Sequence, residues 1–209
     1  PMEFEQDGEF TGFDIELMRA IAGELGLDLA VVNSGFDPIT SGTAMQSGDC
    51  DIAAASITIT DEREENIDFS DPYFVADQSL LVKKDAGIST LSDLSGRNLG
   101  VQSGTTGEAY AEENAAGATI VSFDAPGDLF VALEAGEIEG ILQDIVVNAD
   151  RLLSDDTVTL AETYPTDENY GLAVKEEGSE DLLAAVNDAL GALRDSGDYD
   201  SIYDDWFGG

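Results

Sequence analysis

The stretch from Asp49 to Tyr73 carries side chains suited to binding a carboxylate. Hydroxyls recur at Ser56, Thr58 and Thr60 after a short apolar run, and a lone arginine, Arg63, follows within a run of acids. A guanidinium can grip a carboxylate through two charge-assisted hydrogen bonds, each contributing about 1.5–3 kcal/mol. The stretch therefore predicts a carboxylate site just beyond a buried strand. The alternative is that Arg63 is a solvated helix residue paired with neighbouring glutamates.

A second segment repeats the pattern that precedes this stretch. Residues 36–51 and 123–139 share Phe-Asp, a proline helix start, a glycine stop and an acid three residues past the glycine. Eight residues past each glycine lie Ser56 and Asp144, at what would be matching strand ends. In open α/β sheets ligands bind at these carboxyl ends, so two such lobes would enclose a ligand. Chance similarity of two β-α-β units is the alternative.

Asp144 is the chemical complement of Arg63, because a carboxylate accepts hydrogen bonds from an ammonium group. A cleft with these two residues on opposite walls would suit a zwitterion. The alternative for Asp144 is a helix N-cap, a position that aspartate favours. Phe36 lies at a predicted strand end, where it either stacks on a ligand or belongs to the core.

The loop at 100–107, GVQSGTTG, follows a predicted strand and opens a predicted helix. Its backbone N–H groups and hydroxyls suit an anion at a helix N-terminus. It lacks the Gly-Lys-Ser/Thr ending of a nucleotide-binding loop, which argues against nucleotides. A plain helix-capping loop is the alternative.

These residues sit among alternating strands and helices, which predict an α/β fold with mainly parallel sheets. Apolar periodicity, caps and glycine stops predict helices at 14–25, 37–48, 60–66, 108–116, 126–135, 144–153 and 179–193, and strands at 27–31, 50–55, 80–82, 98–101, 119–123, 140–142, 158–160 and 170–174.

Charge excludes several classes of partner and indicates an unusual solvent. The 209 residues include 45 acids, 8 bases and no histidine, for a net charge of -37. Nucleic acid is excluded as a partner, because phosphate binding needs clustered Lys and Arg. The acids recur in every segment of a chain with 43% hydrophobic residues, so we expect a folded protein adapted to very high salt.

Far-UV circular dichroism against salt concentration tests that adaptation. At molar salt the screening length falls to about 3 Å and self-repulsion nearly disappears, so helix content should rise to a plateau there. In millimolar salt we expect most of the helix signal to be lost. Full folding in millimolar salt would contradict the adaptation to high salt.

The composition also narrows the chemistry. Without histidine the chain has no Ser-His-Asp or Cys-His pairing and no histidine metal ligand. The single cysteine, Cys50, excludes an internal disulfide and is expected to be a small buried residue. Acid pairs such as Asp49 and Asp51 lack an EF-hand pattern, so we expect neither a metal nor a cofactor. The first residue is a proline, and we expect a mature or truncated chain.

Several motifs together resemble one family. The stretch DIAAASITITDEREENIDFSDPY is similar to the signature of extracellular solute-binding proteins of polar amino-acid ABC transporters, family 3. Further similar segments are GEFTGFDIELMRAIAGELG, LSGRNLGVQSGTTGEAY, GILQD and YDSIYDDWFG. The resemblance implies a type II periplasmic-binding-protein fold of two lobes, with the ligand in the interlobe cleft. Lobe 1 would span 1–82 plus 172–209 and lobe 2 would span 83–171, joined by two hinge strands near 82–84 and 171–173.

The resemblance also implies roles for individual residues. Arg63 would hold the ligand's α-carboxylate with Thr58 and Thr106, while Asp144 would hold the α-amino group with Ser56. Phe36 would stack on the ligand side chain. The two remaining predicted contacts, which would tune specificity for the side chain, are Gln102 and Gln143.

The implied function is a non-catalytic, monomeric receptor that delivers a polar amino acid to a membrane permease. The family's usual first strand is absent before Pro1, so its ligand contacts are absent as well. We expect an extracellular location, with a membrane tether through a lipid anchor upstream of residue 1. One alternative is a cyclohexadienyl dehydratase-like enzyme on the same fold, for which Asp144 is the only evident acid or base. Another is a sensor module, which would need a signalling domain.

Overall fold

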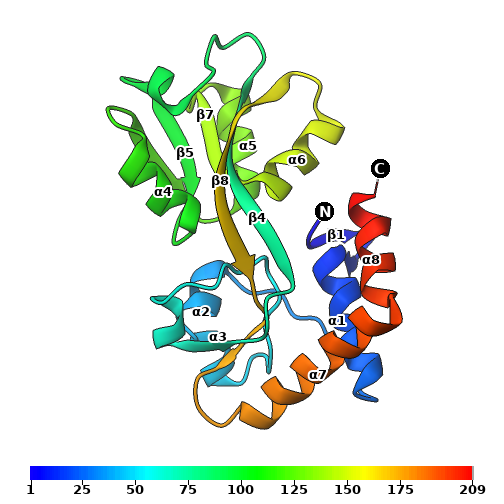
Figure 1. Ribbon diagram of the computed structural model, residues 1–209. Coiled ribbons are helices and arrows are strands. Elements are labelled where there is room, and N and C mark those ends of the chain that lie inside the picture. Colours follow the sequence, from blue (N-terminus) through cyan, green and yellow to red (C-terminus); the bar gives the residue numbers. More distant parts are fainter. Residues whose placement is uncertain (209) are drawn as a thin grey trace. The chain divides into compact units, whose positions relative to one another are not determined.

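The computed structural model describes residues 1–208 and divides them into two compact units (Figure 1). Unit 1 contains Pro1–Val75 and the chain from Asn169 onward, and unit 2 is Ala76–Glu168. Both boundaries differ from the expected 82/83 and 171/172. Residues 78–82 pair with a strand of unit 2, and the backbone N–H of Ile59 in unit 1 donates to Asn169 O at 2.8 Å. Hydrogen bonding by the crossing segments therefore moves both boundaries.

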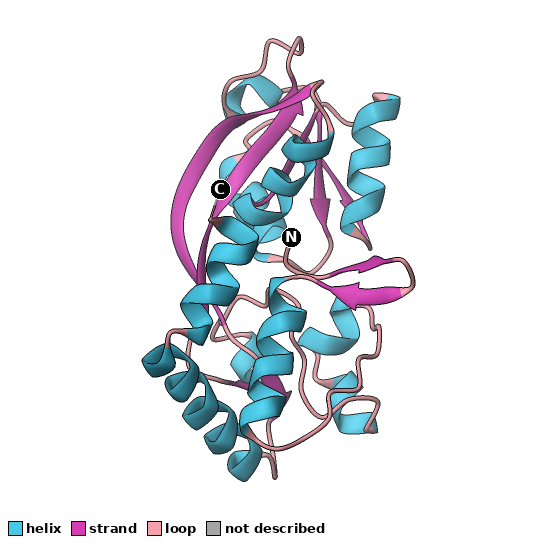
Figure 2. Ribbon diagram, turned by 90° about the vertical axis from the view of Figure 1, so that its right-hand side faces the viewer, coloured by secondary structure: helices cyan, strands magenta, loops and turns pink. Residues whose placement is uncertain are grey.

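Unit 1 combines short strand pairs with three longer helices. Its elements are β1 (Phe4–Gln6), β2 (Glu9–Thr11), α1 (Phe13–Glu24), α2 (Phe36–Thr40), α3 (Thr43–Ser47), the 3₁₀ turn η1 (Arg63–Glu65), β3 (Ile67–Phe69), β9 (Ala173–Lys175), α7 (Glu180–Ser196) and α8 (Asp198–Phe207). Figure 2 shows β1 and β2 as a short antiparallel hairpin. β3 pairs antiparallel with β9.

An aromatic cluster joins the helices of unit 1. Phe13 at the start of α1 is fully buried, and its ring lies near five other aromatic rings at centroid distances from 5.4 to 6.3 Å. Those rings belong to Tyr73, Phe74, Tyr199, Tyr203 and Phe207. Aromatic pairs of this kind stabilise a core beyond their buried area. The C-terminal helices are therefore held against the segment at 73–74.

Unit 2 is a five-stranded sheet in the order β6-β5-β7-β4-β8. Its elements are β4 (Phe74–Lys83, which starts in unit 1), η2 (Leu91–Leu94), β5 (Asn98–Gln102), α4 (Thr106–Asn114), β6 (Thr119–Phe123), α5 (Pro126–Ala135), β7 (Gly140–Asp144), α6 (Ile145–Ser154) and β8 (Val158–Tyr170, which ends in unit 1). Leu80 and Leu142 pack with α4, whereas Leu81 and Ile141 pack with α5. The two helices thus cover opposite faces of the sheet (Figure 1).

Parallel pairing is confined to one half of that sheet. β5 runs parallel to β6 and β7, while β7 pairs antiparallel with β4. The expectation of mainly parallel sheets therefore holds only for β6-β5-β7. No helix in the described chain is long and apolar enough to cross a membrane.

Two predicted strands are absent from the structure. Residues 27–31 form no strand, and the nearby Leu27 and Val32 are 61% and 57% exposed. Residues 50–55 form only an isolated bridge from Ala53 to Ala173. Alternating apolar residues make a strand only where a neighbouring strand supplies hydrogen bonds. In the described chain neither segment lies in a ladder.

The single helix predicted at 37–48 is instead two short helices, α2 and α3. Gly42 separates them with a φ of 74°, a left-handed conformation that glycine adopts without strain. A Cβ at this position would lie 2.6 Å from the backbone oxygen of Asn66. The glycine therefore permits a close approach of the backbone as well as a turn.

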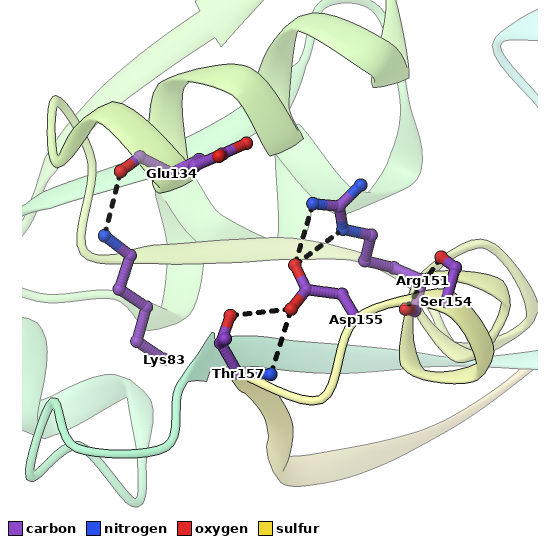
Figure 3. A network of polar contacts seen from close by, with 6 residues as sticks. All are labelled: Lys83, Glu134, Arg151, Ser154, Asp155 and Thr157. Carbon is purple, nitrogen blue, oxygen red and sulfur yellow. Dashed lines mark hydrogen bonds and ion pairs between the residues drawn. The ribbon is translucent and has the colours of Figure 1, made fainter.

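A polar network closes the end of α6 in unit 2 (Figure 3). Asp155 Oδ1 accepts from Thr157 Oγ1 at 2.6 Å and from Thr157 N at 2.9 Å. Its Oδ2 accepts from Arg151 Nη2 at 2.7 Å. Nearby, Lys83 Nζ donates to the backbone oxygen of Glu134 at 3.0 Å. The bonds from Thr157, and then those from Arg151, favour the carboxylate and lower the pKa of Asp155 to about 2.

Asp155→Asn should lower the melting temperature by about 2–4 °C at neutral pH, because the folded chain stabilises this carboxylate. An unfolded aspartate has a pKa of about 3.9. The stability that the charge provides is therefore present above about pH 4 and lost as the pH falls toward 2. Thermal denaturation against pH measures this, with the exposed neighbour Asp156→Asn as control. A difference from wild type that persists at pH 2 would contradict the assignment.

Candidate functional site

Arg63 opens η1 and is buried, with only 7% of its surface exposed. Its Nη1 donates to the backbone oxygen of Thr58 at 2.6 Å, and its backbone N–H donates to Thr60 Oγ1 at 3.2 Å. The guanidinium carbon lies 5.2 Å from the centroid of the Phe36 ring. This burial rules out the solvated helix residue considered as the alternative. Arg63, Thr58 and Phe36 therefore form one set in unit 1.

Ser56 lies two residues before Thr58 in a strained conformation. Its φ of 50° is left-handed, which is uncommon for residues other than glycine. The Ser56 N–H donates to Asp14 Oδ2 at 2.9 Å, and its hydroxyl contacts Glu3 Oε2 at 3.4 Å. Such strain persists where surrounding contacts hold it, and Asp14 supplies one of them.

Asp14 is a buried acid that sequence reasoning read only as a helix start. It is fully buried in α1, and burial raises its pKa to about 6, although the Ser56 N–H and the Tyr73 hydroxyl favour its charged form. Its Oδ1 and the Tyr73 hydroxyl lie buried without a partner in hydrogen-bonding geometry. Burial and Asp14 together raise the pKa of Tyr73 well above its usual range, so the phenol stays neutral.

Asp144 ends β7 in unit 2 and lies opposite Gln78 of β4. It occupies the N-cap position of α6, but its side chain makes no capping hydrogen bond. Gln78 Nε2 instead donates to Asp144 Oδ1 at 2.5 Å. The carboxylate therefore does not serve the helix N-terminus that the alternative proposed for it.

Gln78 brings Thr106 and Glu168 to the same place. Its Nε2 also lies 2.9 Å from Glu168 Oε1 and 3.3 Å from Thr106 Oγ1. The Thr106 hydroxyl donates to Glu168 Oε2 at 2.5 Å. A hydroxyl has one hydrogen, so Thr106 would offer a ligand carboxylate its backbone N–H at the start of α4. Sequence reasoning missed Gln78 and Glu168, which are 90 positions apart.

The loop before α4 behaves as a capping loop. Thr105 is the N-cap, and its hydroxyl accepts from the Glu108 N–H at 3.2 Å. Glu108 in turn accepts from the Gly104 N–H at 2.8 Å through Oε2. This reciprocal arrangement matches the plain capping alternative.

The two predicted specificity residues are not brought together with Asp144. Gln143 is only 5% exposed and donates through Nε2 to Asn148 Oδ1 at 2.8 Å. Successive residues of a strand point to opposite faces, so Gln143 and Asp144 diverge. The side chain of Gln102 donates to the backbone oxygen of Asp124 at 3.4 Å.

Each unit thus holds a set with one kind of chemistry. The unit 1 set presents a buried guanidinium and an aromatic ring, which suit a carboxylate with an attached side chain. The unit 2 set gathers two carboxylates around one amide, which suits a group rich in hydrogen-bond donors such as an ammonium. Within residues 1–208, no cluster of three or more acids or other metal-binding side chains is placed to hold a metal ion.

Comparison with protein families identifies a match over the whole chain. Residues 1–209 match the bacterial extracellular solute-binding proteins, family 3.

Individual relatives cover nearly the whole chain. The L-cystine-binding protein TcyJ of Escherichia coli (strain K12) is 32% identical over 100% of this chain and 79% of its own length. The glutamine-binding ABC transporter protein GlnH of Bacillus subtilis (strain 168) is 34% identical over 95% of this chain and 73% of its own.

Solved structures share the fold. An ancestral arginine-binding protein bound to glutamine superposes with a TM-score of 0.93 at 38% identity, covering 100% of this chain and 93% of its own. AncCDT-1, an ancestral amino acid-binding protein and precursor of cyclohexadienyl dehydratase, gives 0.88 at 35% identity, covering 99% and 90%.

Proposed function

The chain belongs to family 3 of the bacterial extracellular solute-binding proteins, and from this we propose that it captures a polar amino acid and delivers it to the permease of an ABC transporter. Its relatives TcyJ and GlnH are named for binding L-cystine and glutamine. Members of the family act outside the cytoplasmic membrane, and the same location is proposed here. The lipid tether and the monomeric state stay predictions.

The observation that carries this proposal is the buried guanidinium of Arg63. An arginine that is 7% exposed, with one nitrogen on a backbone carbonyl, needs further acceptors to balance the cost of burying its charge. The carboxylate of an amino acid supplies two of them in matched geometry. We assign the carboxylate to Arg63 and the backbone N–H of Thr106, with Thr58 and Phe36 alongside Arg63.

The ammonium group is assigned to the unit 2 set and to Ser56. Asp144 supplies a carboxylate oxygen, and Ser56 supplies its backbone carbonyl. The left-handed backbone of Ser56 and its bond to Asp14 support this role, because they hold the carbonyl in one orientation.

We propose that binding is not followed by catalysis. Glu168 provides the second carboxylate that a dehydratase-like mechanism would require, and AncCDT-1 shows a related fold as the precursor of such an enzyme. However, Gln78 donates to both carboxylates and Thr106 donates to Glu168, which favours their charged forms and a holding role. Incubation with arogenate or prephenate should therefore give no product.

A ligand screen in molar salt tests the proposed function. L-glutamine, L-arginine, L-lysine, L-histidine and L-cystine are suitable probes, because relatives are named for binding them. A ligand at 100 times its dissociation constant stabilises the folded state by about 2.7 kcal/mol, so at least one probe should raise the melting temperature. No shift with any common amino acid would contradict the proposal.

A further inference from the structure

Gln78 is a buried amide in the middle of the unit 2 set. Its side chain is fully buried on β4, and its Nε2 faces three oxygens at 2.5, 2.9 and 3.3 Å. An amide nitrogen has two hydrogens, so three acceptors compete for them. The amide is therefore saturated on its nitrogen side.

Its carbonyl side shows the opposite condition. Gln78 Oε1 is buried without a hydrogen-bond partner. Gly107 in the first turn of α4 packs directly against it, since a Cβ there would lie 3.0 Å from Oε1. Turning the amide over would place this oxygen against two carboxylates, which is electrostatically worse. The fold thus leaves one acceptor unsatisfied in order to aim both hydrogens at the acids.

The two acids gain a defined separation from this amide. Asp144 and Glu168 both contact one nitrogen atom, so their contacting oxygens lie within two hydrogen-bond lengths of each other. Like charges at that range repel, and a shared donor offsets part of the repulsion. Removing the donor would let the Asp144 carboxylate turn away from Glu168.

We propose that Gln78 is a positioning residue that orients the Asp144 carboxylate for the ligand's ammonium group. The inference rests on the proposed function. Gln78 acts through Asp144 and makes no contact with the ligand. Glu168 completes the arrangement by taking the Thr106 hydroxyl hydrogen, which fixes the first residue of α4.

The variant Gln78→Met tests this role, because methionine keeps the length of the side chain and removes both donors. Titration calorimetry in molar salt would use the five amino acids named above. For each probe that binds the wild type, we expect affinity to fall about 10- to 100-fold, as for the loss of an oriented charge-assisted contact.

Asn148→Leu is the matched control. Asn148 is a fully buried amide in the same unit, and its Nδ2 donates to Ser79 Oγ at 2.9 Å, next along β4 from Gln78. Successive strand residues face opposite sides, so this variant disturbs the other face of the sheet. It should lower the melting temperature comparably and leave affinity within about twofold of wild type.

A double-variant cycle separates positioning from general damage. If Gln78 acts through Asp144, then Gln78→Met combined with Asp144→Asn should bind no more weakly than Asp144→Asn alone, within about twofold. Additive losses, or wild-type affinity in Gln78→Met, would overturn the positioning role and leave the proposed function standing. A wild-type protein that binds none of the probes would overturn both.

Discussion

Replacing Arg63 by alanine is expected to weaken amino-acid binding by at least about 100-fold, as measured by titration calorimetry in molar salt. The reason is the pair of charge-assisted hydrogen bonds assigned to the ligand carboxylate. Arg63→Lys keeps the charge and loses the planar fork, so it should recover only part of that affinity. The graded order of wild type, lysine and alanine distinguishes geometric recognition from simple charge attraction.

The matched control for Arg63 is Arg19→Ala. Arg19 also belongs to unit 1, but it is exposed and pairs with Glu16 on α1. Its removal changes the net charge equally and should leave affinity unchanged. Because the buried Arg63 also bonds to Thr58, circular dichroism must first establish that the variant folds. A folded Arg63→Ala protein with micromolar affinity would remove Arg63 from the carboxylate role.

The second large effect is expected from Asp144→Asn. The change is isosteric, replaces a charged acceptor with a neutral amide, and should weaken amino-acid binding about 10- to 100-fold by calorimetry. It also places an amide beside Gln78, and one of the two amides must turn to avoid opposing donors.

Asp128→Asn serves as the control for Asp144, because Asp128 is an exposed acid of the same unit in the first turn of α5. The loss in Asp144→Asn should be specific to the ammonium group. An analogue without the α-amino group should bind wild type and Asp144→Asn alike. If Asp144→Asn weakened both ligands to the same degree, Asp144 would be acting on the fold rather than on the ammonium.

Local signals predict those elements that carry their own start and stop. The bounds of α5 are those expected, because Pro126 opens the helix and Gly136 ends it at a φ of 76°. β6 also lies where its apolar run predicts it. The segments at 27–31 and 50–55 carry comparable apolar patterns and are not strands. A strand depends on a distant partner, which its own residues cannot specify.

The candidate site divides in the same way. Arg63 stands out as a lone base among acids, and Asp144 emerges from the repeated spacing, so both are visible in the sequence. Asp14, Gln78 and Glu168 are not visible, because their contacts join positions 42, 66 and 90 residues apart. An aspartate in the first turn of a helix and a glutamine in a strand have ordinary explanations until the fold brings their partners near. The two-lobed family fold expected from the motifs is confirmed by the similar solved structures.

Titration calorimetry of the wild-type protein in molar salt tests the central claim most directly, with each of the five amino acids set against its counterpart lacking the α-amino group. The combined assignment of Arg63 and Asp144 predicts one-to-one binding of at least one amino acid, and binding of its deaminated counterpart weaker by about 10-fold or more. Equal affinity for the two members of a pair, or no binding of any amino acid by the folded protein, would contradict it.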